Sequence, residues 1–309
     1  MTAMAGKAET HVPVLLDEAV AALAVKRGGR YVDGTLGRAG HARAVAGLGG
    51  LVLGIDRDEQ ALREVAGMQI EGLTAVKGNH GDVFKIANDF GWSYADGVLL
   101  DLGVSSPQLD EAGRGFSFMR DGPLDMRMDR SCGVSAAEIV NGESEERLEA
   151  IFRTFGEEPQ SRRIAKALVR ARAKGRRFKS TAELAGFVES VTGRRGPHHP
   201  ATRVFQALRM EVNDEIGELR RALAGALELL AAGGRLAVIS FESLTDRETK
   251  AFFALHAGRE VALQQGGSEW RGERPRVRLV TRRAVKASAE EAAANPRSRS
   301  ARLRVAEKE

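Results

Sequence analysis

The chain is poor in cysteine, with Cys132 as the single thiol in 309 residues. One cysteine excludes an internal disulfide and any cysteine-cluster zinc site, and it fits a reducing compartment. The six histidines are scattered apart from the adjacent His198 and His199, and they show no metal-ligand spacing. We therefore expect a cytoplasmic protein without a bound metal.

Long apolar runs are also lacking. Residues 1–10 have no apolar core of the kind found in signal peptides, and no run approaches the about 20 residues of a membrane span. A membrane partner is therefore not expected. The hydrophobic content of 43% is ample for a core, and 309 residues suit one large or two modest domains. The net charge of +5 is mild, so the distribution of charge is more informative than its total.

Glycine, by contrast, is concentrated between two short apolar segments. Residues 31–41 read YVDGTLGRAGH, and residues 51–56 read LVLGID and end in a carboxylate. Glycines let a loop turn sharply and approach a ligand, and an acid at the next strand end is placed to accept ribose hydroxyls. The spacing Gly-x-x-Gly-x-x-Gly differs from that of dinucleotide enzymes. It favours a nucleoside cofactor without pyrophosphate, such as S-adenosylmethionine, over a merely structural turn.

Strand and helix patterns alternate along the first third of the chain, which indicates a parallel α/β sheet. Expected strands lie at 30–32, 51–55, 73–76, 97–100, 235–241 and 277–280, with helices at 17–25 and 58–67. Between them, helices alone are expected, at 145–155, 160–174, 180–191 and 202–230. We predict a discontinuous α/β domain, residues 1–112 and 205–309, interrupted by residues 113–204. The tail after Lys286 is expected to be partly disordered.

Three aspartates follow expected strands: Asp33, Asp56 and Asp101. Ligands of parallel sheets bind outside the carboxyl ends of the strands, so all three should lie at one edge. Any one of them alone could be a helix cap or a solvated loop residue. Three at successive strand ends favour a cofactor site.

Several irregular strings resemble one known family over nearly the whole chain. They are residues 11–18, 99–110, 115–129, 199–209 and 295–300. These strings are similar to the bacterial small-subunit (16S) ribosomal RNA cytosine-N4 methyltransferases. The resemblance implies a class I (Rossmann-like) S-adenosylmethionine-dependent methyltransferase domain with an all-helical insertion. It further implies N4-methylation of a specific cytidine in the decoding region, with 16S rRNA in the small ribosomal subunit as partner.

The same resemblance implies individual cofactor contacts. Ala39, Gly40 and His41 should line the methionine end and Asp56 should hold the ribose. The remaining cofactor contacts implied are His80 beside the adenine, with Asp82 as the alternative there, and Asp101 and Gln108. Relatives carry a histidine where this chain has Glu242.

Cytosine's exocyclic amine is a poor nucleophile, so hydrogen-bond acceptors on its hydrogens would help it react. The Asp/Asn-Pro-Pro-aromatic string of general amino-methyltransferases is absent. We therefore consider Asp101 as the acceptor, against a role in cofactor binding alone. The loop 113–129, with Phe116 and Phe118, is expected to be a lid or base clamp rather than an ordered structural loop.

Residues 160–180 contain nine cationic side chains and no acidic one. On a helix, Arg162, Lys166, Arg170 and Lys174 form one stripe, which we expect to contact RNA phosphates rather than only solvent. Together with the lid loop, this makes residues 113–204 the expected RNA-recognition region. The tail arginines, Arg297, Arg299, Arg302 and Arg304, are a second candidate.

Three rival functions remain open on the sequence. A nicotinamide-dependent oxidoreductase is disfavoured by the glycine spacing. A non-catalytic RNA-binding or ribosome-assembly protein would need a vestigial cofactor pocket. A methyltransferase for DNA or another RNA differs only in its target. Oligomeric state, and the choice between naked RNA and an assembled subunit as substrate, are left undetermined.

Overall fold

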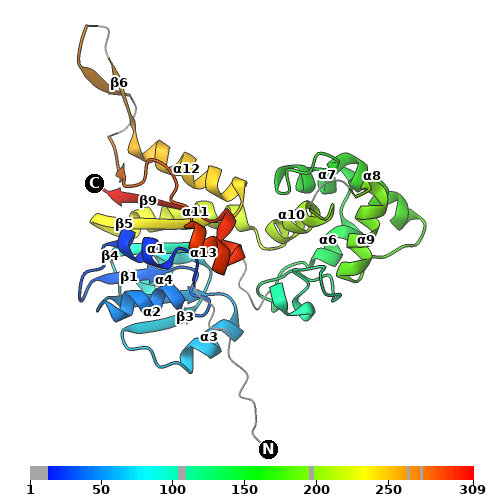
Figure 1. The fold of residues 1–309 in the computed structure, drawn as a ribbon, viewed down its shortest axis with the longest axis horizontal. Coiled ribbons are helices and arrows are strands. Elements are labelled where there is room, and N and C mark those ends of the chain that lie inside the picture. Colours follow the sequence, from blue (N-terminus) through cyan, green and yellow to red (C-terminus); the bar gives the residue numbers. More distant parts are fainter. Residues whose placement is uncertain (1–12, 104–108, 195–197, 263–264, 272–273) are drawn as a thin grey trace, which may run out of the picture. The chain divides into compact units, whose positions relative to one another are not determined.

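The computed structural model describes residues 13–103, 109–194, 198–262, 265–271 and 274–309 (Figure 1). The chain divides into two compact units. Residues 1–103 and 220–309 form one, here called the α/β unit, and residues 104–219 form the other, the helical unit. The sequence placed these divisions at 112/113 and 204/205. The second division of the structure lies inside a helix, α11 (Glu215–Leu229), where no change in composition marks it.

The α/β unit is built on a seven-stranded sheet of order β3-β2-β1-β4-β5-β9-β8. The bounds are β1 Arg30–Asp33, β2 Leu51–Asp56, β3 Leu73–Lys77, β4 Ala95–Leu102, β5 Leu230–Ser240, β8 Val277–Leu279 and β9 Arg302–Lys308. Strands β1 to β5 are parallel, whereas β9 runs antiparallel to both β5 and β8. The order reverses between β1 and β4, which is where parallel sheets bind ligands. The predicted α/β class is confirmed.

Helices cover the sheet because the strands are apolar on both faces. Val98 and Leu100 of β4 are fully buried, as is Leu99 apart from 2% of its surface. Helices of this unit are α1 Leu16–Leu23, α2 Gly40–Gly47, α3 Glu59–Ala66, α4 Val83–Asp89, α12 Ser243–Ala257 and α13 Ala289–Ala294, with the 3₁₀ turns η1 His80–Asp82 and η3 Pro296–Ser300. A separate ribbon pairs β6 (Arg259–Ala262) with β7 (Ser268–Arg271).

The C-terminal tail is ordered, so the prediction of partial disorder after Lys286 is wrong. Strand β9 pairs with β5 along six residues and is a central strand of its half of the sheet. Leu303 and Val305 are buried, while Arg302 and Arg304 bind the carboxylate of Asp246, with Arg304 Nε 2.7 Å from its Oδ1. These two arginines are therefore part of the fold rather than a free basic tail.

The helical unit contains 3₁₀ turn η2 Ala112–Arg114, α6 Ala136–Gly142, α7 Glu145–Thr154, α8 Ser161–Ala173, α9 Thr181–Thr192, α10 Thr202–Val212 and the beginning of α11. A capping box begins α9, since Ser180 and Glu183 bind each other's backbone N–H. The single helix expected at 202–230 is instead two helices, α10 and α11. The chain breaks at Asp214, which has the left-handed φ of 46°.

Candidate active site

The predicted aspartates lie at one edge of the sheet. Asp33 ends β1, Asp56 ends β2, and Asp101 is the last residue but one of β4. In the parallel register Asp33 lies opposite Gly54 of β2 and Leu99 of β4, so the three strand ends are neighbours. Sequence reasoning therefore placed this edge correctly.

Backbone donors hold the Asp56 carboxylate in place. The Gly37 N–H donates to Oδ2 and the Asp58 N–H donates to Oδ1, both at 2.8 Å. Burial nevertheless raises the pKa of this carboxyl, and the two donors offset part of that rise. Each carboxylate oxygen keeps a second lone pair, which is what a diol ligand requires.

Thr35 connects Asp33 with Asp101, a link that the sequence analysis missed. The Asp101 N–H donates to Thr35 Oγ1 at 2.6 Å, and the Thr35 N–H donates to Asp33 Oδ1 at 3.1 Å. Burial raises the pKa of Asp33 to about 6, and neighbouring His41 partly opposes this rise. The sequence signal for this link was Thr35 itself, a small hydroxyl residue within the glycine loop.

Asp101 has the most unusual environment of this edge. Its Oδ1 is buried and has no hydrogen-bond partner among the described residues. Burial alone raises the pKa of this carboxyl to about 7. The Nδ1 of His41 lies 3.8 Å from Asp101 Oδ2, beyond hydrogen-bond reach. An unmet buried carboxylate oxygen is costly, so it indicates a group that binds there.

His41 is fixed at the start of α2. Its Nε2 lies 3.0 Å from the carbonyl oxygen of Val14, and its side chain is buried. Burial lowers the pKa of His41, so the ring is neutral at pH 7. Because a carbonyl only accepts, Nε2 carries the hydrogen and the bare Nδ1 faces Asp101. Ala39, the N-cap residue of α2, is buried and has a left-handed φ of 58°.

His80 lies in turn η1, between β3 and α4. Its Nε2 is buried and has no partner in the described part of the chain. Burial, with help from the positive charges of Arg57 and Arg221, lowers the pKa of His80 to about 3. The ring is therefore a neutral, flat surface at physiological pH. The alternative residue, Asp82, is exposed.

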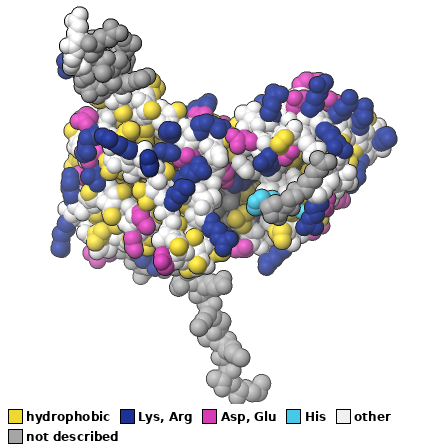
Figure 2. Space-filling model, turned by 45° about the horizontal axis from the view of Figure 1, so that its top comes forward, with side chains coloured by type: hydrophobic (Ala, Val, Ile, Leu, Met, Phe, Trp, Pro, Cys, Tyr) yellow, Lys and Arg dark blue, Asp and Glu magenta, His cyan; other side chains and the backbone are white. Residues whose placement is uncertain are grey.

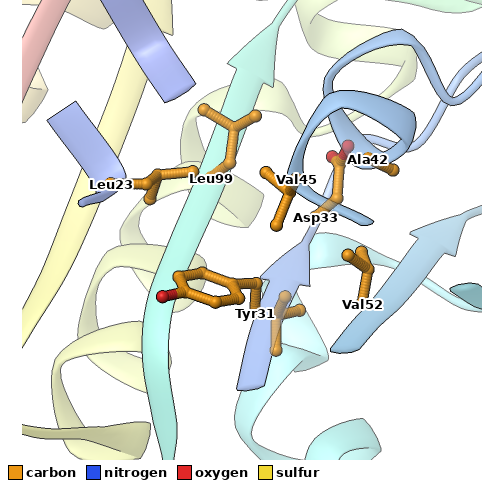
Figure 3. A pocket seen from close by; sticks show the side chains of 8 residues that line it. Leu23, Tyr31, Asp33, Ala42, Val45, Val52 and Leu99 are labelled. Atoms are coloured by element: carbon orange, nitrogen blue, oxygen red, sulfur yellow. The ribbon is translucent and has the colours of Figure 1, made fainter. Parts of the chain in front are cut away.

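Two glycines of the loop pack closely against neighbouring side chains. A side chain on Gly34 would begin 2.6 Å from Leu100 Cδ2, and one on Gly40 would begin 2.1 Å from Pro13 Cγ. Below the loop, a small apolar cavity lies between β1 and α2 (Figure 3). The Asp33 carboxylate points toward Ala42 there (Figure 3). This cavity is too small and too apolar for a nucleoside.

The helical unit contains the predicted substrate residues. Phe116 is 7% exposed and belongs to the hydrophobic core of this unit. This burial argues against the predicted role of Phe116 as a base clamp. Phe118 is partly buried, with its ring centroid 4.8 Å from that of Phe205. Arg162 and Lys166 are exposed on α8, as expected. Gln108 lies outside the described residues.

Comparison with known proteins gives the family. Residues 8–309 match the model of the MraW methylase family. The chain belongs to that family. A relative from Methylocella silvestris, named Ribosomal RNA small subunit methyltransferase H, is 50% identical over 97% of this chain and 88% of its own length. Another of that name, from Thermomicrobium roseum, is 47% identical over 97% of this chain and 94% of its own.

Solved structures with a similar arrangement are only distantly related. They include an rRNA methylase from Streptococcus thermophilus, 12% identical over 94% of this chain and 92% of its own, with a TM-score of 0.40. Fibrillarin from Aeropyrum pernix, solved with S-adenosyl-L-methionine, is 10% identical over 94% of this chain and 73% of its own, with a TM-score of 0.37.

Family and sheet order together confirm the predicted methyltransferase. The chain is a class I enzyme that uses S-adenosylmethionine. In the described ranges, no group of three or more His, Cys, Asp or Glu side chains is placed to hold a metal ion. Nor does any helix among those residues have the length and apolar character needed to cross a membrane.

Proposed function

We infer that this enzyme methylates N4 of a specific cytidine in the decoding region of 16S rRNA, within the small ribosomal subunit of the cytoplasm. The names of the relatives, at about half identity over the full chain, support ribosomal RNA of the small subunit as substrate. The observation that carries the chemistry is the buried Asp101 Oδ1 at the carboxyl edge of the sheet, for which the described residues offer no hydrogen-bond partner.

The residues at this edge suit the cofactor. Bound S-adenosylmethionine supplies a methyl group on a good leaving group, so the protein's task is to position the acceptor and exclude water. Asp56 presents two anchored oxygens for the ribose hydroxyls, and neutral His80 presents a flat ring and a free Nε2 for the adenine. The backbone at Ala39, Gly40 and His41 serves the methionine end.

Asp101 is suited to act on the cytosine amine. A carboxylate in this place accepts a hydrogen bond from the amine. This bond turns the nitrogen lone pair out of conjugation with the ring. The pKa of about 7 divides the side chain between its two forms at neutral pH, so it can also take up the proton that the amine releases. The competing role, cofactor binding alone, predicts an effect on cofactor affinity without one on turnover.

The helical unit provides the surface for RNA. Arg162, Lys166 and Arg170 are exposed on α8, and Lys174 is exposed directly after its last residue. None of the four has an ion-pair partner in the described chain. Figure 2 shows Lys and Arg side chains spread over the face of the helical unit that is in view. Such unpaired cations bind phosphates without reading bases. Phe118, partly buried near His199, is the remaining aromatic candidate for a base contact.

In vitro methylation tests this function. Small subunits that lack the modification are incubated with the enzyme and labelled S-adenosylmethionine, and the modified nucleotide is identified by mass mapping of the rRNA. We expect one N4-methylcytidine in the decoding region. Label in another base, in another region or in free DNA only would contradict the proposal. Naked 16S rRNA in a parallel reaction shows whether an assembled subunit is needed.

A further inference from the structure

Three residues at the beginning of the described chain connect the active site with the C-terminal segment. Pro13 packs directly against Gly40, at the start of α2. The Val14 carbonyl accepts the hydrogen bond from His41 Nε2 at 3.0 Å, and the Leu15 N–H donates to Glu291 Oε1 at 2.8 Å. We call residues 13–15 the strap. It carries a continuous set of contacts from helix α13, 276 positions away in sequence, to the His41 ring.

The strap contains an unfavourable backbone conformation, which contacts with neighbouring residues must stabilise. Leu15 is fully buried and has the left-handed φ of 53°, which is costly for a residue with a bulky side chain. No side chain caps α1 at this position. The Glu291 carboxylate is the partner of the Leu15 N–H, and a charged acceptor makes a stronger bond than a neutral one.

Glu291 is presented by an anchored part of the chain. Ser288 caps α13 through the Glu291 N–H, and Val285 pairs with Leu303 just before it. Beyond α13, Ser298 and Ala301 are buried and β9 is held between β5 and β8. Figure 1 shows α13 lying beside α1. The C-terminal segment can therefore hold the strap without moving itself.

We propose that Glu291 is a positioning residue for methyl transfer. Its carboxylate fixes Leu15, which places the Val14 carbonyl. That carbonyl in turn keeps the hydrogen of His41 on Nε2 and turns the bare Nδ1 toward Asp101. The proposal rests on the proposed function in one respect, that His41 lines the cofactor site. It explains why a tail far from the glycine loop in sequence belongs to the catalytic unit.

Cofactor affinity separates this role from a merely structural one. Glu291→Ala removes the acceptor, Glu291→Gln keeps an oxygen acceptor, and Glu290→Ala changes an exposed acid in the same helical turn. By calorimetry with S-adenosylmethionine, Glu291→Ala should raise Kd about tenfold. Glu291→Gln, with its weaker neutral acceptor, should lose clearly less affinity than Glu291→Ala, and Glu290→Ala should stay within about twofold of the parent. An unchanged Kd for Glu291→Ala, or equal losses for both Glu291 variants, would overturn the proposal.

A second measurement does not depend on the cofactor. ¹⁵N NMR of the free protein reports the tautomer of His41, and hydrogen exchange reports protection of the Leu15 amide. We expect an Nε2–H tautomer and a protected amide in the parent, and loss of both in Glu291→Ala. A parent that binds no cofactor would refute the proposed function, while the ring signal would still decide the role of Glu291. A normal tautomer and a protected Leu15 amide in Glu291→Ala would refute that role alone.

Discussion

In the part of the chain that the structure describes, both units contain polar groups without a partner, but these groups differ in what they cost the protein. Asp101 Oδ1 and His80 Nε2 are buried in the α/β unit, where a missing hydrogen bond is paid for in stability. Arg162 and Lys166 of the helical unit are exposed, and water solvates them at no cost. The buried groups therefore indicate a ligand at a defined place. The exposed groups indicate only a surface that attracts phosphates.

Replacing Asp101 should have the largest effect. Asp101→Asn removes the proton acceptor while keeping the shape, so kcat at saturating cofactor should fall about 10²–10⁴-fold. In the parent, the raised pKa of about 7 means that turnover increases with pH as the carboxylate forms. The variant should lose this increase. Steady-state kinetics from pH 5.5 to 8.5 measure both effects, with exposed Asp89→Asn as control.

The same variant should be more stable, which would confirm that the carboxylate is buried at a cost. An unfolded aspartate ionises near pH 4, whereas folded Asp101 ionises only near pH 7. Its contribution to stability is therefore fully present below pH 4 and is lost as pH rises through 7. Asp101→Asn should gain at least about 1 kcal/mol of unfolding free energy at pH 8 and nothing at pH 4.

In the kinetic test, a rise in cofactor KM with unchanged kcat would instead assign Asp101 to cofactor binding alone.

Phe116→Ala tests whether the loop after η2 is structure rather than a base clamp. Because Phe116 is 7% exposed within the core of the helical unit, the change should cost about 3–5 kcal/mol of unfolding free energy. Cofactor affinity should not change. Met119→Ala, at an 82% exposed position of the same loop, is the matched control. If denaturant unfolding shows no loss of unfolding free energy for Phe116→Ala, Phe116 would again be a candidate for substrate contact.

His80 tests the second buried group. His80→Ala should raise the Kd for S-adenosylmethionine about tenfold by removing the flat surface and the Nε2 acceptor. His80→Phe should recover the part that depends on stacking. Because the pKa of His80 is about 3, parent binding should show no step near pH 6.5 caused by this residue. A pH-dependent step that disappears in His80→Phe would contradict a neutral ring.

The basic stripe of α8 should affect RNA binding, and each of its cations should contribute only a small part. Arg162→Glu with Lys166→Glu should weaken binding of small subunits about tenfold near 0.1 M salt and reduce the log–log salt slope by about two. Lys85→Glu, an exposed change in the α/β unit, should leave both nearly unchanged. Filter binding at several salt concentrations measures this. An unaltered slope would remove α8 from the RNA surface.

Local patterns were sufficient for the carboxyl edge and insufficient for long-range partners. Apolar runs ending in Asp33, Asp56 and Asp101 predicted the strands, and the glycine spacing predicted the loop. The strand Arg302–Lys308 was missed because its alternating Leu303 and Val305 depend on pairing with β5, which is more than 60 positions away in sequence. The composition of such a segment, taken alone, predicts a partly disordered tail.

The strap was beyond sequence reasoning for the same reason. No sequence pattern near Leu15 predicts a left-handed residue. No pattern near Glu291 predicts that its carboxylate accepts the hydrogen bond of the Leu15 N–H. The pKa values of Asp101 and His80 were equally hidden, since they depend on burial by the whole unit rather than on neighbouring residues.

A crystal structure of the enzyme with S-adenosylhomocysteine would show whether the carboxyl edge of the sheet is the cofactor site. We expect the ligand to lie along the carboxyl ends of β1, β2 and β4, with its ribose on Asp56 and a hydrogen-bond donor on Asp101 Oδ1. A ligand bound elsewhere, or one that leaves Asp101 Oδ1 buried and without a partner, would contradict it.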